Sequence, residues 1–446
     1  MGAHAHDHGH DHSHDLDASP GVARLLQVAV GLLVVLTVAG LLWFRPGTGV
    51  ELPQGLDAQG QRVEATVIGD ESVECAGADF GSSVECREIR IEITSGPSAG
   101  TTSSFEQFPD AQMATPDFET GDRLVVNEYE LGDTGEIAHT FADFQRSTPM
   151  LLLAALFVVA VVALGRFQGI RAIGGLAVSA VVLLGYVFPA LLDGQAPLGV
   201  ALAASSVIAF AALYLAHGVS HTTTVALLGT MAALGLTGLL AAVFTSAASI
   251  TGLATEDQIF LLVSAEGIDI SGLVLAGIVL GSLGVLDDVT VTQVSAVARL
   301  REANPEYGVG ELYRTGVRIG RDHIASTVNT LVLAYAGASL PLLLFYANVG
   351  IGLSEAVTSE IVAVEVIRTL VGSVGLVAAV PITTALAAVV VTGTGIPTSW
   401  TGRARRQPSA VSPSTGSPSA GSEAAESEPA GSDPDWDEFA PDPEDF

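Results

Sequence analysis

Residues 25–44 read LLQVAVGLLVVLTVAGLLWF, an apolar run that contains no charged side chain. About twenty such residues suffice to cross the hydrocarbon core of a bilayer as a helix. A secretory signal peptide is the alternative, but the run is longer than the apolar region of such a peptide, and it ends in Trp43-Phe44-Arg45-Pro46 without a small-residue cleavage site. We therefore expect an uncleaved transmembrane helix over 21–45, with an aromatic anchor at its outer end.

Similar apolar stretches return after Arg146 and fill most of the chain up to residue 402. Charged residues make up only 15% of the sequence, against about a quarter in soluble domains. The charge-free windows are 150–165, 172–192, 196–216, 222–255, 270–286, 324–354 and 369–402. Each can hold one helix, so the sequence predicts a mainly α membrane protein with about eight transmembrane helices. The last seven would form a bundle over 149–402.

The arginines indicate the direction of these helices. The chain has no Lys, and its Arg residues gather in alternate connections of the bundle and after residue 402, whereas the other connections are mainly acidic. The positive-inside rule then predicts that both termini are cytoplasmic and that 51–148 is extracytoplasmic. Although the net charge is −30, no basic stripe is present, so a nucleic-acid partner is not expected.

Residues 51–148 differ from the rest because apolar and polar residues alternate in short runs. Val63–Ile68 and Glu88–Ile93 show this period of two, which is typical of half-buried strands. Gly, Pro, Asn and Asp separate the runs and favour turns. We expect a small β domain between the first and second transmembrane helices, with an OB-like barrel as the candidate fold and an envelope component as a candidate partner.

The only two cysteines, Cys75 and Cys86, both lie in this β segment. Disulfides persist on the oxidising side of a membrane, which favours a structural Cys75–Cys86 bond over two unpaired thiols. This inference agrees with the orientation that the arginines predict.

Both ends of the chain are too polar to build a core, and we expect both to be disordered and cytoplasmic. Residues 403–446 are rich in Ser, Pro, Gly and acidic residues. Residues 1–20 form a His-rich head that contains His4, His6, His8, His10, His12 and His14. Neutral imidazoles bind Zn²⁺ or Ni²⁺, so this head is a metal-binding candidate without fixed geometry. The sequence identifies no other cofactor.

The densest polar signal is 277–301, GIVLGSLGVLDDVTVTQVSAVARLR. Its first residues form a G-x-x-x-G pair that permits close helix contact. Asp287 and Asp288 follow, and adjacent carboxylates repel each other, which favours a proton on one of them. Together with Thr290, Thr292 and Gln293 they form a candidate proton or cation relay. Alternatively, the helix ends here and both acids are solvated.

A second cluster is 354–368, SEAVTSEIVAVEVIR. Glu360 and Glu365 alternate with apolar residues, and Glu365 can pair with Arg368 on one helical turn. A re-entrant or interfacial helix fits this composition, and so does an amphipathic helix that caps the bundle. Asn329 lies inside the seventh predicted span and completes the relay candidates.

No nucleophile elbow, phosphate loop or HExxH pattern is present, so an enzyme is not expected. The stretches GSLGVLDDVTVTQVSAV in 277–301 and SEIVAVEVIRTLVGSVGLVAAVPITTA at 359–385 resemble the bacterial YibE/YibF-like family of multi-pass membrane proteins. The order of helix, small β domain and helical bundle is similar as well. The resemblance covers about residues 25–400 and implies a bacterial plasma membrane protein. This chain has Asp287-Asp288 where family members often have a single Asp.

A fainter likeness, carried by LDDVTVTQVSAVARLRE, is to SecD/SecF-type proton-driven membrane proteins of the resistance-nodulation-division superfamily. These have six spans where about eight are expected here. Three functions therefore stay open. An ion-coupled transporter or transport component leads, followed by a non-transporting scaffold or sensor that uses the external β domain, and by divalent-metal export.

Overall fold

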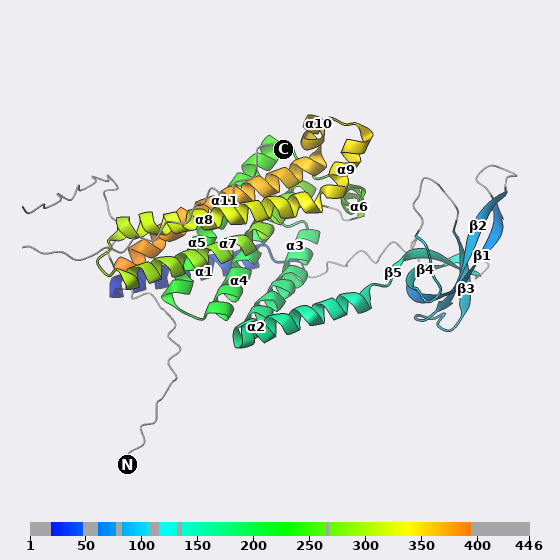
Figure 1. Cartoon of the computed structure of the whole chain (residues 1–446), viewed down its shortest axis with the longest axis horizontal. Coiled ribbons are helices and arrows are strands. Elements are labelled where there is room, and N and C mark those ends of the chain that lie inside the picture. The colour runs from blue at the N-terminus through cyan, green and yellow to red at the C-terminus, as the bar shows by residue number, and fades with distance from the viewer. Residues whose placement is uncertain are drawn as a thin grey trace, which may run out of the picture. The chain divides into compact units, whose positions relative to one another are not determined.

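The computed structural model describes residues 19–47, 61–76, 83–107, 116–131, 136–264 and 267–393 of the chain. Within these ranges the protein is mainly helical, and it has several candidate membrane-spanning helices and one small curled β domain near its N-terminus (Figure 1). This confirms the predicted fold class. The six histidines of the head and the acidic tail lie outside the described residues.

Six helical runs of the described residues are long and apolar enough to cross a membrane. They are α1 Pro20–Trp43, the run Ser147–Leu192, α4 Pro197–His217, α5 His221–Ala247, α7 Ile270–Ala303 and α11 Glu360–Thr392. The helices α8 (Val309–Ala338) and α9 (Leu340–Val349) meet at an angle of 58° and qualify together as a seventh span.

The run Ser147–Leu192 consists of α2 (Ser147–Val182), the π-helical turn η3 (Leu183–Val187) and α3 (Phe188–Leu192). Its 46 residues are more than twice the about twenty that cross a bilayer. The backbone leaves helical geometry at Arg166 (φ 49°, ψ −124°), and α2 turns sharply in Figure 1. The windows predicted at 150–165 and 172–192 therefore lie on the two sides of this break. When the two sides are counted as separate spans, the six runs and the α8–α9 pair amount to about eight spans, as the sequence predicts.

Two helices extend beyond their charge-free windows. α7 continues through Asp287 and Asp288 to Ala303, so the alternative that the helix ends at these acids is wrong. α11 begins at Glu360, directly after the extended residue Ser359. Residues 354–368 are therefore divided between two helices. The first part belongs to the short helix α10 (Leu353–Thr358), and residues from Glu360 onward belong to α11. A second short helix, α6 (Glu256–Ser264), precedes α7.

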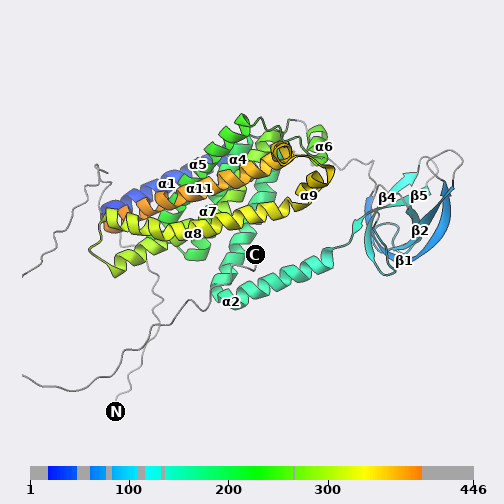
Figure 2. The ribbon, with the colours of Figure 1, turned by 45° about the horizontal axis from the view of Figure 1, so that its top comes forward.

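In the core of the bundle, a glycine of α5 packs against a threonine of α11, and a glycine of α11 packs against a threonine of α5. We call these two contacts the interlock of α5 and α11. A Cβ on Gly375 of α11 would collide with the Thr237 side chain of α5, and a Cβ on Gly229 of α5 would collide with Thr383 of α11. Small residues allow close approach of helices in a membrane, where packing replaces the hydrophobic effect as the driving force. α7 packs against both helices, and α8 runs along α11 (Figure 2).

The β domain is a five-stranded antiparallel sheet of order β3-β2-β1-β4-β5. The strands are β1 Gln61–Ala76, β2 Ser83–Ile93, β3 Thr102–Gln107, β4 Arg123–Leu131 and β5 Glu136–Phe144. Ile89, Ile91 and Ile93 point into the core as the alternation predicted. The sheet curls so that its edge strands β3 and β5 approach each other, an arrangement compatible with a partly open barrel of the OB type.

Candidate functional site

The G-x-x-x-G pair of α7 faces two polar side chains from other helices. A Cβ built on Gly277 would lie 3.8 Å from Nη2 of Arg368 on α11, and one on Gly281 would lie 3.7 Å from the Tyr335 hydroxyl on α8. Because they have no side chains, the two glycines leave room on one face of α7 for the Arg368 guanidinium and the Tyr335 phenol. We call this face the glycine strip. Both lie in the middle of the charge-free window 270–286, well inside a membrane-crossing segment.

Arg368 forms an ion pair with Glu365 one turn away on the same helix. Nη1 of Arg368 donates to Oε1 of Glu365 at 2.7 Å, as the spacing predicted, and the two side chains are only 27% and 28% exposed. Nε of Arg368 is buried and has no hydrogen-bond acceptor among the described residues. Charged groups in a membrane-spanning segment are costly, and they persist mainly along pathways for ions or substrates.

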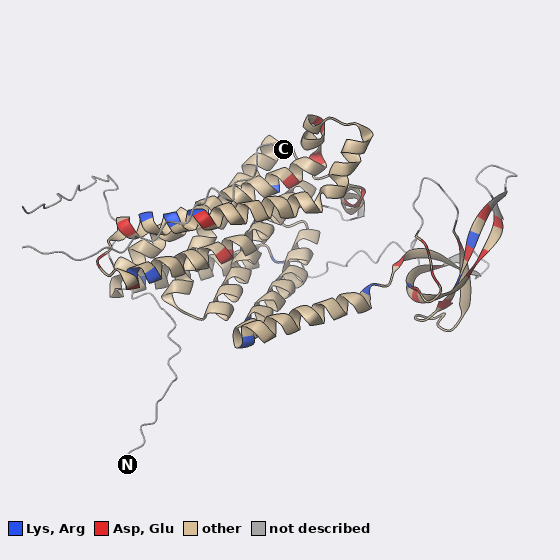
Figure 3. Cartoon of the chain, in the orientation of Figure 1, with Lys and Arg blue, Asp and Glu red and all other residues tan. Residues whose placement is uncertain are grey.

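A small cavity adjoins this ion pair. Its polar lining comes from Ser282 of α7, Tyr335 of α8, and Arg368 and Thr369 of α11. The cavity measures about 10 Å³, which is the size that one water molecule needs. We call these four residues and Glu365 the Arg368 cluster. Figure 3 shows that charged residues are few along the helices of the bundle.

The adjacent acids of α7 have different surroundings, because successive residues of a helix point about 100° apart. Asp288 is exposed, whereas Asp287 is partly buried and its Oδ1 is a buried atom without a hydrogen-bond partner among the described residues. Asp287 lies six residues beyond Gly281, or about 9 Å along the helix. It therefore forms a second polar level in the same bundle.

Beyond Asp287, two polar residues of α7 connect helices to one another. Thr290 and Thr230 of α5 share a 2.6 Å hydrogen bond. The Gln293 amide donates to the Gly316 carbonyl of α8 at 2.8 Å and to Thr384 of α11 at 2.7 Å. Because these groups are buried and satisfied, they fix the packing of α7 against its neighbours.

Three other relay candidates lie apart from the Arg368 cluster. Thr292 and Asn329 are exposed, so Asn329 does not face the bundle interior. Glu360 accepts hydrogen bonds from the amides of Thr251 (2.8 Å) and Gly252 (2.6 Å) and from the Thr251 hydroxyl. It therefore anchors the loop that follows α5.

Tyr335, Ser282 and Thr369 belong to the cluster but were not predicted from the sequence. They lie in apolar windows, where a single hydroxyl side chain forms no recognisable sequence motif. The glycine spacing of α7 was the available clue, because it marks a face on which another helix can come close.

The cysteine and metal predictions fall largely outside the described residues. Cys86 is buried and disulfide-bonded, but the side chain of Cys75 is not described, so its pairing stays a prediction. The histidines of the head are not described either. Among the described residues, no group of three or more His, Cys, Asp or Glu side chains is arranged to hold a metal ion.

Comparison with known protein families gives a match over the helical bundle. A family model described as YibE/F-like protein matches residues 153–393, which is more than half of the chain and includes every helix of the Arg368 cluster. No curated protein and no solved structure matches the chain.

Proposed function

The chain belongs to the YibE/F-like family, and we propose that it acts as an ion-coupled transporter or as a component of a transport system. The observation that carries this proposal is the Arg368–Glu365 ion pair opposite the glycine strip of α7. A purely structural bundle gains little from such a pair, since taking two charges out of water costs as much as their attraction returns.

In the proposed mechanism, the two polar levels along α7 act in series. Asp287 binds a proton or a cation, because its buried Oδ1 has no protein partner among the described residues. The Arg368 cluster forms the other level, where the transported cation displaces the guanidinium from the Glu365 carboxylate. Tyr335 and Ser282 supply hydroxyls that replace lost hydration at this level.

We also propose that the protein resides in a bacterial plasma membrane with both termini in the cytoplasm. In Figure 3 many of the basic residues lie toward the end of the bundle where α7 gives way to α8. The positive-inside rule supports a cytoplasmic position for that end. The β domain would then lie outside, where it can bind an envelope partner.

The test is proton movement in vesicles that contain the purified full chain. A pH-sensitive dye inside the vesicles reports proton flux when gradients of Na⁺, K⁺, Mg²⁺ or Zn²⁺ are imposed in turn. We expect one gradient to drive flux, Asp287→Asn and Arg368→Gln to abolish it, and Asp288→Asn to leave it intact. Flux that is equal in all variants would overturn the relay.

The same experiment separates the remaining functions. Flux driven by Zn²⁺ alone supports divalent-metal export, in which the His-rich head would sense the cargo. If no gradient drives flux, and removal of the β domain reproduces the phenotype of gene deletion while Asp287→Asn does not, the scaffold or sensor function replaces transport.

A further inference from the structure

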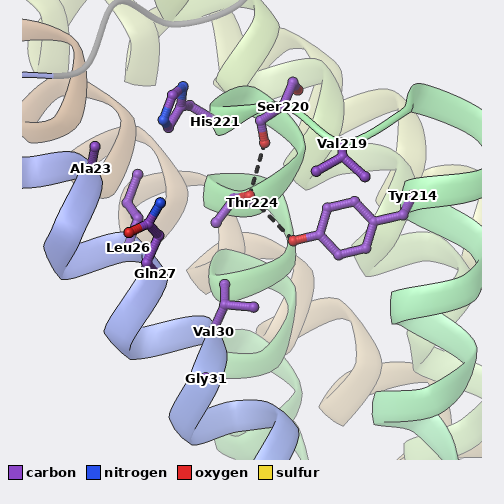
Figure 4. Close-up of a pocket in the computed structure, with 10 residues that line it drawn as sticks. All are labelled: Ala23, Leu26, Gln27, Val30, Gly31, Tyr214, Val219, Ser220, His221 and Thr224. Carbon is purple, nitrogen blue, oxygen red and sulfur yellow. Dashed lines mark hydrogen bonds between the residues drawn. The ribbon is translucent and has the colours of Figure 1, made fainter.

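A pocket of about 420 Å³ lies between α1, α4 and α5, away from the Arg368 cluster (Figure 4). Ligand pockets in proteins commonly measure about 300–1,000 Å³ and combine an apolar lining with a few polar groups. Leu26, Val30 and Gly31 of α1 form the apolar side. This volume is large enough for a ligand of appreciable size, in contrast to the cavity beside Arg368.

The polar side of the pocket is a chain of hydroxyl groups. The Tyr214 hydroxyl lies 3.2 Å from Oγ1 of Thr224, which donates to the Ser220 carbonyl at 2.8 Å. Figure 4 shows these side chains on the α4–α5 side, across from Leu26 and Val30 of α1. Because the Thr224 proton goes to the Ser220 carbonyl, the Tyr214 hydroxyl donates to Thr224, and both oxygens keep lone pairs that accept from a ligand head with hydroxyl donors.

The lining contains no Asp, Glu, Lys or Arg. A phosphate or carboxylate head would need a cationic partner in such a site, because burying an unpaired charge is costly. Besides the hydroxyls, the polar lining is completed by the Gln27 amide and the His221 imidazole. The lining is thus complementary to a neutral head.

The direction of the pocket follows the helices that form it. It extends from Ala23 near the start of α1 to Gly31, and from the α4–α5 connection to Thr224, one turn into α5. All three helices qualify as membrane spans. The polar side therefore adjoins the helix ends, where the bilayer interface lies, and the apolar side runs toward the hydrocarbon core.

We propose that this pocket binds a neutral single-chain amphiphile of the monoacylglycerol type. The glycerol head bonds to the hydroxyls of Tyr214 and Thr224, and the acyl chain packs on Leu26, Val30 and Gly31. A two-chain phospholipid fits less well, because its phosphate finds no Arg or Lys in the lining. This site is independent of the proposed transport mechanism, since it shares no residue with Asp287 or the Arg368 cluster.

The test uses a monoacylglycerol with a photoreactive diazirine in its acyl chain, added to the full-length protein in detergent. We expect saturable labelling of peptides from α1 and α5, and unlabelled monoacylglycerol should compete. Gly31→Leu should reduce labelling at least tenfold, because a Cβ at Gly31 meets no atom within 4 Å and a larger side chain fills the pocket. Thr224→Val should weaken labelling by removing the central hydroxyl.

Gly21→Leu is the matched control, because Gly21 also lies on α1 with open space around its Cβ position but does not line the pocket. Both substitutions raise helix propensity, so neither should impair folding. Equal labelling of the Gly31→Leu and Gly21→Leu proteins would overturn the proposal. Competition by the corresponding free fatty acid as strong as that by monoacylglycerol would also overturn it, because the site would then not select a neutral head.

Discussion

Arg368 donates a 2.7 Å hydrogen bond to Glu365, yet its Nε is buried with no acceptor among the described residues. The pair thus neutralises the charge of the guanidinium without satisfying all of its donors. The guanidinium therefore keeps one buried donor, Nε, that Glu365 does not occupy. Both residues lie on α11, and Arg368 faces Gly277 in the glycine strip of α7.

The first prediction concerns the energetic coupling of this pair. Glu365→Gln leaves the guanidinium without its counter-charge inside the bundle, so the thermal stability of the purified protein should fall. The double variant Glu365→Gln, Arg368→Gln should recover part of that loss, because no lone charge is left behind. Thermal unfolding in detergent measures both. A double variant that is less stable than either single one would contradict the coupling.

The second prediction concerns the interlock of α5 and α11. Gly375→Ala should destabilise the bundle by about 1–3 kcal/mol, because the added methyl group overpacks against Thr237. Gly235→Ala is the matched control, since a Cβ at this position of α5 meets no atom within 4 Å. It should be neutral or slightly stabilising. Thr237→Ala combined with Gly375→Ala should restore stability, and additive losses in this double variant would count against the interlock.

Much of the architecture follows from the sequence because a bilayer imposes a length on apolar segments. The helix predicted over 21–45 agrees with α1 to within two residues at each end, and the run at 196–216 agrees with α4 to within one. The alternation in Glu88–Ile93 likewise predicts the second half of β2, since one face of a sheet must be buried. Both patterns are local, so they can be recognised from the sequence without knowing how distant segments pack.

Local patterns of this kind predict only part of the Arg368 cluster. The Glu365–Arg368 pair follows from its spacing on one helix, but its approach to Gly277 and Tyr335 depends on how three helices pack. The doublet Asp287-Asp288 does not reveal by itself which acid is the more buried one, because adjacent helical residues face different surroundings. The sequence analysis treats 354–368 as a re-entrant, interfacial or capping helix, whereas residues 360–368 are the first part of the long helix α11.

The third prediction assigns Glu360 a structural role. Glu360→Ala should release the amides of Thr251 and Gly252, so their hydrogen exchange in the full chain should become faster. Gly252 has φ +74°, a conformation that the anchored loop needs and that glycine permits. Glu355→Ala, which removes an exposed acid of α10, should leave this exchange unchanged. Loss of transport without a change in exchange would restore Glu360 to the relay.

The last prediction concerns a buried histidine that joins three strands of the β domain. His139 of β5 contacts the Ser103 hydroxyl of β3 through Nδ1 at 2.8 Å and Glu128 of β4 through Nε2 at 3.3 Å. Since β3 and β5 are the two edges of the sheet, the Ser103 contact closes the barrel where no ladder of backbone hydrogen bonds does so.

His139→Phe keeps a ring of similar size but removes both polar contacts and leaves Glu128, whose side chain is only 11% exposed, without this partner. An unsatisfied buried polar group costs about 1–3 kcal/mol. We therefore expect the amides of β3 to exchange about tenfold faster or more in the intact protein, whereas Thr140→Val, on the opposite face of β5, should leave them unchanged. Unaltered protection of β3 in His139→Phe would mean that the apolar core alone holds the sheet closed.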